Sequence, residues 1–223
     1  YGIQGINIDF VNVYLKDKEL MVQFVREAVP LLHEQGLVVS IDVTVKGGSE
    51  TYSLFMDRER IGKLVDYMIV MTYDEHWATS PLAGSVASLP WVEKGITRIM
   101  EEDGVPASKL ILGVPFYTRI WTETKENGTT KVSSRAVGMK VVEDLIAVKG
   151  LVPVYDEKTG QHYVEYREDG KTIKIWIEDE VSMKNRIDLV MKYDLAGVAS
   201  WSRGFEKPEI WSVIRDTLEQ RLR

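Results

Sequence analysis

The sequence predicts an α/β fold built on a parallel sheet, and three observations carry this prediction. Short apolar runs alternate with segments of helical periodicity along most of the chain, as expected for a series of βα units. A stretch in the second half breaks this rhythm with turn signals and alternating residues, which are typical of an inserted hairpin. Polar and aromatic residues directly follow several apolar runs, where the strands of a parallel sheet would end.

The composition is that of a globular domain and excludes several classes of function. The 223 residues are 44% hydrophobic and 28% charged, and a chain of this length can bury a substantial core. A net charge of −6 argues against a nucleic-acid partner. No apolar run approaches the ~18–20 residues that cross a bilayer, so no membrane partner is expected. There is no cysteine, and the three histidines lack ligand spacing, so we expect no metal site and no cofactor.

The first predicted element is a buried strand that begins at Gly5. Apolar residues alternate there with Asn7 and Asp9, and the run continues to Val13. In parallel βα barrels the carboxyl ends of strands carry catalytic residues. Asp9 is therefore either a site residue or a cap for the following loop.

A helix is predicted next, from a cap at Asp17 to about His33. Gly36 follows it in the manner of a C-cap, and Pro30 should kink or shorten it. The residues predicted to form its buried face are Leu20, Phe24, Ala28 and Leu31.

The predicted alternation of strands and helices continues to residue 121, is interrupted, and resumes at about residue 179. Strands are predicted at 37–45, 67–71, 110–116 and 195–200, and helices at 58–64, 137–148, 179–193 and 207–222. Another helix is predicted to start near Ser88, with an apolar face formed by Val92, Ile96 and Ile99. Turn signals at 127–128 and 169–170 lie in the interrupted stretch. The sequence thus predicts a barrel-type domain at 1–121 and 178–223, and a small α+β insertion at 122–177.

Five βα units in series imply a parallel sheet, for which the predicted architecture is a (β/α)8 TIM barrel. The chain enters a strand soon after Tyr1, so the barrel would lack its first three βα units. The insertion would precede the last unit. An open doubly wound sheet is the alternative, but no glycine-rich phosphate loop follows any strand.

Four predicted strand ends carry polar and aromatic residues suited to a sugar. Aromatic rings stack on the apolar faces of pyranoses, and carboxylates and amides bind hydroxyl groups. Because barrel strand ends converge on one cleft, we expect a carbohydrate site there. Each residue also has a structural interpretation, as core, strand cap, surface pair or packing. The candidates are Asn7, Asp9, Met71, Tyr73, Asp74, Tyr117, Arg119 and Trp201.

Five stretches resemble glycoside hydrolase family 18, the chitinase-like barrels, and in particular its bacterial spore branch, which acts on spore-cortex peptidoglycan. The matching stretches are 5–10, 67–77, 84–91, 113–117 and 197–201, in order along nearly the whole chain. The resemblance implies a glycan partner containing N-acetylglucosamine, either peptidoglycan strands or another polysaccharide. It also implies an extracellular or spore-associated location, and LysM modules outside this chain.

The family hydrolyses its substrates with retention by substrate assistance, in which the substrate's own acetamido oxygen attacks the anomeric carbon. Its fourth-strand motif has Asp, Asp, Asp and Glu at the positions occupied here by Gln4, Asn7, Asp9 and Val11. The resemblance implies that Asp9 orients the acetamido group. It implies that Tyr73 hydrogen-bonds the acetamido carbonyl beside Asp74, and that Met71 lines the same pocket. By the same likeness, Tyr117 and Arg119 contact sugars near the cut, and Trp201 lies under one of them.

The departure from the family lies at Val11, where the motif has the acid that protonates the leaving group. Valine has no proton to give, and Asn12 is neutral and would face the other side of the strand. General acid catalysis typically contributes ~10²–10⁴-fold. We therefore predict that the chain binds such glycans but cleaves them poorly or not at all. A natural valine, an engineered one and a shifted register all remain open, and Glu75 is the first other acid to test.

Two further interpretations stay open. The chain could be a carbohydrate-binding, lectin-like or structural spore protein without turnover. It could also be a barrel fragment with no function of its own, since unpaired sheet edges invite association.

Overall fold

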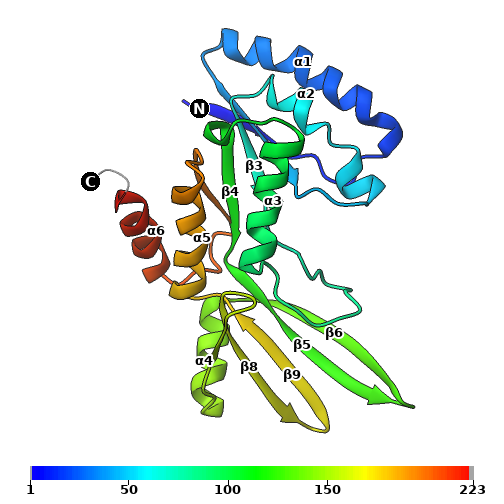
Figure 1. The fold of residues 1–223 in the computed structure, drawn as a ribbon, viewed down its shortest axis with the longest axis vertical. Coiled ribbons are helices and arrows are strands. Elements are labelled where there is room, and N and C mark those ends of the chain that lie inside the picture. The colour runs from blue at the N-terminus through cyan, green and yellow to red at the C-terminus, as the bar shows by residue number, and fades with distance from the viewer. Residues whose placement is uncertain (1, 221–223) are drawn as a thin grey trace. The chain divides into compact units, whose positions relative to one another are not determined.

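The computed structural model describes residues 2–220 and contains two five-stranded sheets (Figure 1). One has the strand order β1-β2-β3-β4-β10, and the other has the order β6-β5-β9-β8-β7. The chain forms two compact units. Unit 1 holds the described residues up to 72, 94–113 and 193–199, and unit 2 holds 73–93, 114–192 and the described residues from 200 onward.

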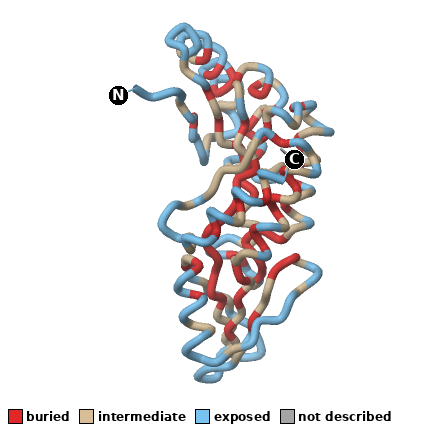
Figure 2. Tube along the Cα trace, turned by 90° about the vertical axis from the view of Figure 1, so that its left-hand side faces the viewer, coloured by how far each residue is buried: buried red, intermediate tan, exposed pale blue. Residues whose placement is uncertain are grey.

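The first sheet confirms the predicted α/β class with a parallel sheet. β1 pairs with β2, β2 with β3 and β3 with β4, all in parallel. Alternate residues of the strands face a buried apolar layer that includes Val39, Ile41, Met68, Val70, Leu110 and Leu112 (Figure 2). The strands are β1 (Gly5–Ile8), β2 (Val38–Thr44), β3 (Tyr67–Met71), β4 (Leu110–Pro115) and β10 (Gly197–Trp201). An eight-stranded barrel without its first three units stays a prediction.

The first strand is shorter than predicted. It ends at Ile8, which is buried, whereas Phe10 and Val11 are 47% and 46% exposed. β1 stands at the end of the strand order, so among the described residues it pairs on one side only. Asn12 has a positive φ of 61°, a conformation that asparagine tolerates better than most residues, and the chain turns there.

The first helix exists as predicted but buries a different face. It runs as α1 (Lys18–Glu34), and Gly36 follows with a φ of 71°. Asp17 occupies the N-cap position without a side-chain cap bond, and the helix continues past Pro30, so Pro30 does not end it. Apolar residues occur on more than one side of this helix, so the prediction of its buried face from periodicity was wrong. The residues buried in α1 are Met21, Val22, Val25 and Val29, whereas Leu20, Phe24 and Leu31 are exposed and Ala28 is half-buried.

No helix of the described residues is long and apolar enough to cross a membrane.

The remaining elements of unit 1 confirm most of the predicted alternation. The predicted apolar stripe of the helix that starts near Ser88, formed by Val92, Ile96 and Ile99, is fully buried. The elements are the short turns Leu15–Asp17, Glu50–Leu54 and Ala107–Lys109, with α2 (Arg58–Gly62) and α3 (Leu89–Glu102), which passes from unit 2 into unit 1.

Unit 2 contains the second sheet, in which β5 pairs with β6 and β9, and β8 pairs with β7 and β9, all antiparallel. Both predicted turns are present: Asn127 and Gly128 have φ values of 49° and 79°, and Asp169 and Gly170 have 49° and 73°. Positive φ at both turn residues suits the right-handed twist of a hairpin. The hairpin predicted around Asp169 and Gly170, with strands at 162–166 and 172–177, is confirmed by β8 and β9. The sequence did not predict the long strand that begins directly after β4. The strands are β5 (Tyr117–Glu126), β6 (Thr129–Gly138), β7 (Val154–Asp156), β8 (Gln161–Glu168) and β9 (Lys171–Ile177).

Three helices complete unit 2, and the sequence predicts all of them. The core under the second sheet joins Ile120, Val164 and Ile175 to Val142 of the first of these helices. The predicted end of the last helix at Leu222 lies outside the described residues. The helices are α4 (Met139–Lys149), α5 (Glu180–Lys192) and α6 (Glu209–Glu219). The division into a barrel-type domain and an insertion at 122–177 stays a prediction.

A buried ion pair ties the loop before α3 to the second sheet and α5. Arg186 Nη2 donates to Glu178 Oε1 at 2.8 Å and to the carbonyl of Ala87 at 2.6 Å, and both charged side chains are 1% exposed. Gln161 Nε2 also donates to Glu178 Oε1, at 2.9 Å, and its own oxygen accepts from Ser85. Burial raises the pKa of Glu178, and the Arg186 guanidinium opposes that rise. The loop at 85–87 is therefore fixed by a desolvated charge pair.

Replacing Arg186 by Met should be strongly destabilising. Glu178 would remain buried without its counter-charge, and breaking such a pair costs about 3–5 kcal/mol. We expect urea unfolding to show a loss of this size. A double variant with Glu178→Gln and Arg186→Met should recover much of it. The control Lys184→Met, in an exposed pair on the same helix, should leave the unfolding midpoint nearly unchanged. Equal losses in the single and double variants would contradict this account.

Candidate functional site

The predicted site residues fall into two groups, one in each unit. Unit 1 carries Asn7, Asp9, Val11 and Met71, and unit 2 carries Tyr73, Asp74, Tyr117, Arg119 and Trp201. Among the described residues, no group of three or more His, Asp and Glu side chains could hold a metal ion.

In unit 1 the side chain of Asn7 is tied to the neighbouring strand. Its Nδ2 donates to Asp42 Oδ2 at 3.0 Å, and its Oδ1 accepts from Ser40 Oγ at 2.8 Å. These two bonds engage both ends of the Asn7 amide with β2. The side chain therefore has one defined orientation, set from the adjacent strand.

The sequence analysis missed Asp42, which lies within β2. Its pKa is raised, first by burial and then by the charge of Asp9, while the hydrogen bond from Asn7 opposes the rise. The available signal was the alternation of β2, in which Ser40, Asp42 and Thr44 share one face and Val39, Ile41 and Val43 are fully buried on the other. A carboxylate in the middle of a strand is costly to bury, so its position calls for an explanation.

Asp9 and Val11 follow β1 in an exposed segment. Asp9 lies one residue beyond Ile8, which pairs with Ile41, so the next residues along the two strands are Asp9 and Asp42. The Val11 side chain is apolar and 46% exposed, and it offers no proton. Met71, at the end of β3, is 8% exposed and fits either a core or a pocket-lining role.

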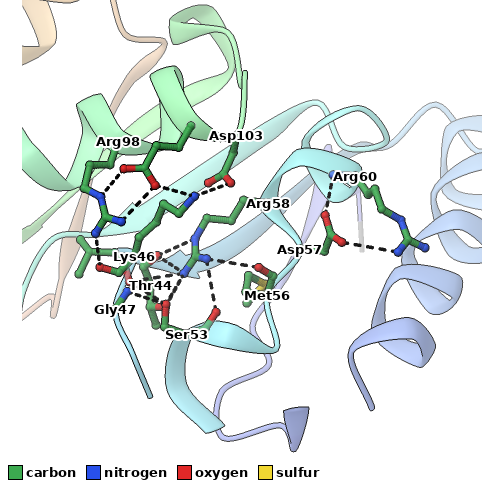
Figure 3. A network of polar contacts seen from close by, with 12 residues as sticks. Thr44, Lys46, Gly47, Ser53, Met56, Asp57, Arg58, Arg60, Arg98 and Asp103 are labelled. Atoms are coloured by element: carbon green, nitrogen blue, oxygen red, sulfur yellow. Dashed lines mark hydrogen bonds and ion pairs between the residues drawn. The ribbon is translucent and has the colours of Figure 1, made fainter. Parts of the chain in front are cut away.

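The loop after β2 is held by Arg58, which is 4% exposed (Figure 3). Its Nη2 donates to the Thr44 carbonyl at 2.7 Å and to Ser53 Oγ at 3.1 Å, and its Nη1 donates to the Met56 carbonyl at 3.3 Å. Burial lowers the pKa of Arg58 to about 10, which still leaves it charged at neutral pH. One buried cation thus joins the end of β2, the following loop and the start of α2.

A second set of contacts anchors the same loop to α3. Lys46 Nζ lies 2.6 Å from Asp103 Oδ1 and 3.1 Å from Glu102 Oε2, and Arg98 Nη1 donates to the Lys46 carbonyl at 3.1 Å (Figure 3). The loop that begins where the polar face of β2 ends is therefore held from two sides.

In unit 2, Tyr117, Arg119 and Asp74 form a hydrogen-bonded cluster. Tyr117 Oη donates to Asp74 Oδ1 at 2.6 Å, and Arg119 Nη2 lies 3.3 Å from the same oxygen. The Arg119 guanidinium also lies over the Tyr117 ring, 5.9 Å from its centroid, and Tyr73 meets that ring edge-on at 6.3 Å. The structure thus brings together four of the five candidates in this unit.

Burial and charge fix the chemical state of this cluster. Burial raises the pKa of Tyr117, and the charge of Asp74 adds to the rise, so the phenol stays a neutral donor. Arg119 is 8% exposed, and its Nε has no hydrogen-bond partner among the described residues. Asp74 has a φ of 60°, an uncommon conformation outside glycine, at the point where the chain leaves β3. The cluster can offer a carboxylate, a phenol and a buried guanidinium N–H.

Glu75 has a structural task. Its Oε2 accepts from the Ser88 backbone N–H at 2.8 Å, and its Oε1 accepts from Ser88 Oγ at 3.0 Å. Ser88 immediately precedes α3, where a carboxylate stabilises the positive end of the helix dipole. Both oxygens are thus occupied, which weakens the case for Glu75 as a substitute acid.

Trp201, the fifth candidate in unit 2, ends β10 with its side chain 55% exposed. Its backbone carbonyl accepts from the Phe116 N–H at 2.7 Å, which fixes the strand end. An exposed indole on an anchored backbone has a face available for stacking.

The parallel sheet, the antiparallel second sheet and the polar strand ends together match a carbohydrate-active α/β protein. The sequence profile described as glycosyl hydrolases family 18 matches residues 1–206. The chain belongs to this family, as the sequence resemblance indicated.

The relatives of this chain include spore and chitinase proteins. A Bacillus subtilis (strain 168) protein named uncharacterized glycosylase YvbX is 28% identical over 221 residues, covering 96% of this chain and 61% of the relative. The cortical fragment-lytic enzyme of the same organism is 26% identical and covers 97% of this chain and 50% of the relative. The chain spans about half to two thirds of the length of these relatives.

Solved structures agree on the fold. A chitinase from Chromobacterium violaceum superposes with a TM-score of 0.86 at 27% identity, covering 96% of this chain and 66% of the other. The spore cortex-lytic enzyme SleL of Bacillus megaterium gives a TM-score of 0.83 at 24% identity, covering 96% of this chain and 49% of the other. At 24% identity, the second match supports the fold alone.

Replacing Arg58 by Met should loosen the loop after β2. The carbonyls of Thr44 and Met56 would lose a buried donor, and unsatisfied buried groups cost about 1–3 kcal/mol each. We expect a loss of stability on the order of 3 kcal/mol in urea unfolding. Amide hydrogen exchange should also rise first at 45–56. Lys63→Met, on the neighbouring surface, is the control and should change neither reading. An Arg58 variant as stable as the parent would show that the network is not needed.

Proposed function

We propose that this chain binds glycans containing N-acetylglucosamine, with spore-cortex peptidoglycan as the first candidate, and that it cleaves them poorly or not at all. The observation that carries this proposal is the apolar side chain of Val11 in the position of the family's acid, two residues beyond Asp9. A retaining, substrate-assisted hydrolysis needs a proton donor for the leaving sugar. Asp9 remains to orient the acetamido group, but the donor is missing.

Unit 2 supports the binding half of the proposal. The buried Arg119 Nε is a donor without a partner among the described residues, and sugar hydroxyls are ready acceptors. Tyr117 and Arg119 hold Asp74 at one oxygen, which limits its motion. In the family's scheme Tyr73 binds the acetamido carbonyl and Trp201 supports a sugar ring. Met71 would line the pocket around the acetamido group.

The choice of cortex peptidoglycan rests on the names of similar proteins. Cortical fragment-lytic enzymes of Bacillus subtilis and Bacillus anthracis match almost the whole chain. Chitin is the other glycan to test, because chitinases are among the similar structures. A spore-associated or extracellular location and LysM modules outside this chain belong to the same proposal.

A second candidate function is glycan binding without turnover, as in a lectin-like or structural spore protein. Val11 favours it directly, because a binding protein needs no acid. The two candidates differ in what a glutamate at this position would restore.

The decisive change is Val11→Glu. If the acid is all that is missing, this variant should hydrolyse cortex fragments or chitin oligomers at least ~10²-fold faster than the parent, since general acid catalysis typically contributes that much. Release of reducing sugar, measured side by side, checks the prediction. Val11→Gln, with a similar shape and no proton to give, is the matched control.

Two results would change the proposal. Equal cleavage by the parent and Val11→Glu would mean that another group supplies the proton. Binding without cleavage in both proteins would favour the lectin-like or structural role.

Tyr117→Phe tests the cluster in unit 2. It removes the Tyr117 hydroxyl from Asp74 but keeps the ring, so it should lower stability by about 1.5–3 kcal/mol, the contribution of a hydrogen bond to a charged group. Under conditions where the variant stays folded, glycan affinity should fall because Asp74 loses one of the two groups that hold it. Titration calorimetry with chitin oligomers measures this. Tyr163→Phe, whose hydroxyl bonds exposed Glu165, is the control and should bind as the parent does. Unchanged affinity in Tyr117→Phe would remove this cluster from the proposed site.

A further inference from the structure

The polar face of β2 carries a carboxyl group that the family's fourth-strand motif does not include. Asp42 accepts from Asn7 Nδ2 at 3.0 Å, and Asn7 in turn accepts from Ser40 Oγ at 2.8 Å. In the family's motif an aspartate stands at the position of Asn7. This chain has an amide there, bonded to a carboxyl group on the next strand.

The register places this carboxyl group beside Asp9. β1 and β2 pair in parallel with Ile8 opposite Ile41. The residue after Ile8, directly beyond the end of β1, is Asp9, and the residue after Ile41, within β2, is Asp42. Neighbouring strands lie about 4.8 Å apart, so residues at one level are close. The charge of Asp9 also contributes to the raised pKa of Asp42, after burial.

The surroundings of Asp42 contain little that could compensate a second negative charge. Its neighbours are Asn7 on β1 and Asp9 directly after β1, and on β3 the residue opposite it is the apolar Ile69. On β2 itself the same face carries the neutral Ser40 and Thr44. Among the groups that act on its ionisation, Asp9 is the charged one, and burial and Asp9 both raise the pKa of Asp42. Two carboxyl groups so placed ionise together only at a cost.

We propose that Asp42 is a positioning residue for Asp9, supplying from β2 the neighbouring carboxyl group that the motif lacks at Asn7. This inference rests on the proposed function, in which Asp9 orients the acetamido group of a glycan. When Asp42 is protonated, one of its oxygens still accepts from Asn7 and the other carries the proton.

A pH dependence of glycan binding follows from this arrangement. A sugar lying over Asp9 excludes water from Asp42 as well, and loss of water favours the neutral carboxyl group. Binding then takes up a proton, so affinity falls as pH rises through the titration of Asp42. If binding raises its pKa by half a unit, affinity falls about threefold across the transition.

The first experiment needs no glycan. Carboxyl carbon NMR of the 223-residue protein would follow Asp42 from about pH 3 to about pH 8, a range that covers the ordinary aspartate pKa of about 3.9. Asp9→Asn removes the neighbouring charge and should lower the pKa of Asp42. Asp188→Asn, at an exposed pair on α5, is the control and should leave it unchanged. An Asp42 titration that is the same with and without Asp9 would overturn the proposal.

Stability gives a second reading of the same pair. Because the folded-state pKa of Asp42 lies above its unfolded value, the folded state loses stability as pH rises from the unfolded pKa through the folded one. Asp42→Asn still accepts from Asn7 but has no charge to bury. Its advantage over the parent should be absent below the unfolded pKa and appear above it. A constant difference at all pH values would indicate a purely structural role.

The last arm uses tri-N-acetylchitotriose as the probe. Its affinity for the parent should fall at least about threefold over the Asp42 transition, and Asp42→Asn should bind with a flat profile. Identical profiles would overturn the proposal. If neither protein binds the probe or cortex fragments, the proposed function fails, while the titration and stability experiments still decide whether Asp42 and Asp9 are a coupled pair.

Discussion

Desolvated charge is the constraint on which the local structure of this protein depends. A charged group that is buried without hydrogen bonds or an opposite charge lowers the stability of the fold by several kcal/mol. Arg58 donates hydrogen bonds to neutral oxygens and thereby fixes the loop after β2. Arg186 forms an ion pair with Glu178 and fixes the loop before α3. Asp42 finds only a neutral amide and is left beside a like charge. The first two arrangements are structural, and the third is the one to which we assign a functional role.

In the proposed function, this chain retains one part of the family's mechanism and lacks another. Substrate assistance separates the group that orients the acetamido from the group that protonates the leaving oxygen. In the proposed function Asp9 keeps the first task, and Val11 cannot perform the second. Sugar recognition would persist in that case, because stacking and hydroxyl binding are assigned to other residues. On this proposal a single position separates a hydrolase from a binding protein.

The sequence predicted the class of fold, the strands of the parallel sheet and most helices, because strand and turn signals are local. It did not predict β5 and β6, and the roles of the candidate site residues stay predictions. Asn127–Gly128 marked its hairpin turn, and Thr72 to Asp74 marked a strand end. The buried face of α1 could not be predicted, since more than one stripe of that helix is apolar and tertiary contacts chose between them. Asp42 was missed for a related reason. Its importance lies in a bond to Asn7 that only the register of β1 and β2 reveals.

The position of β5 limits how the chain can be truncated. This ten-residue strand begins at Tyr117, carries Arg119, and runs without a break to the turn at Asn127. Tyr117 and Arg119, which are proposed to contact sugar, therefore lie on the same continuous strand as the hairpin formed by β5 and β6. Cutting the chain at residue 122 to remove or graft the second sheet would sever that strand in its middle. The second sheet is not a detachable module, and changes in its length or composition reach Tyr117 and Arg119 along a single strand.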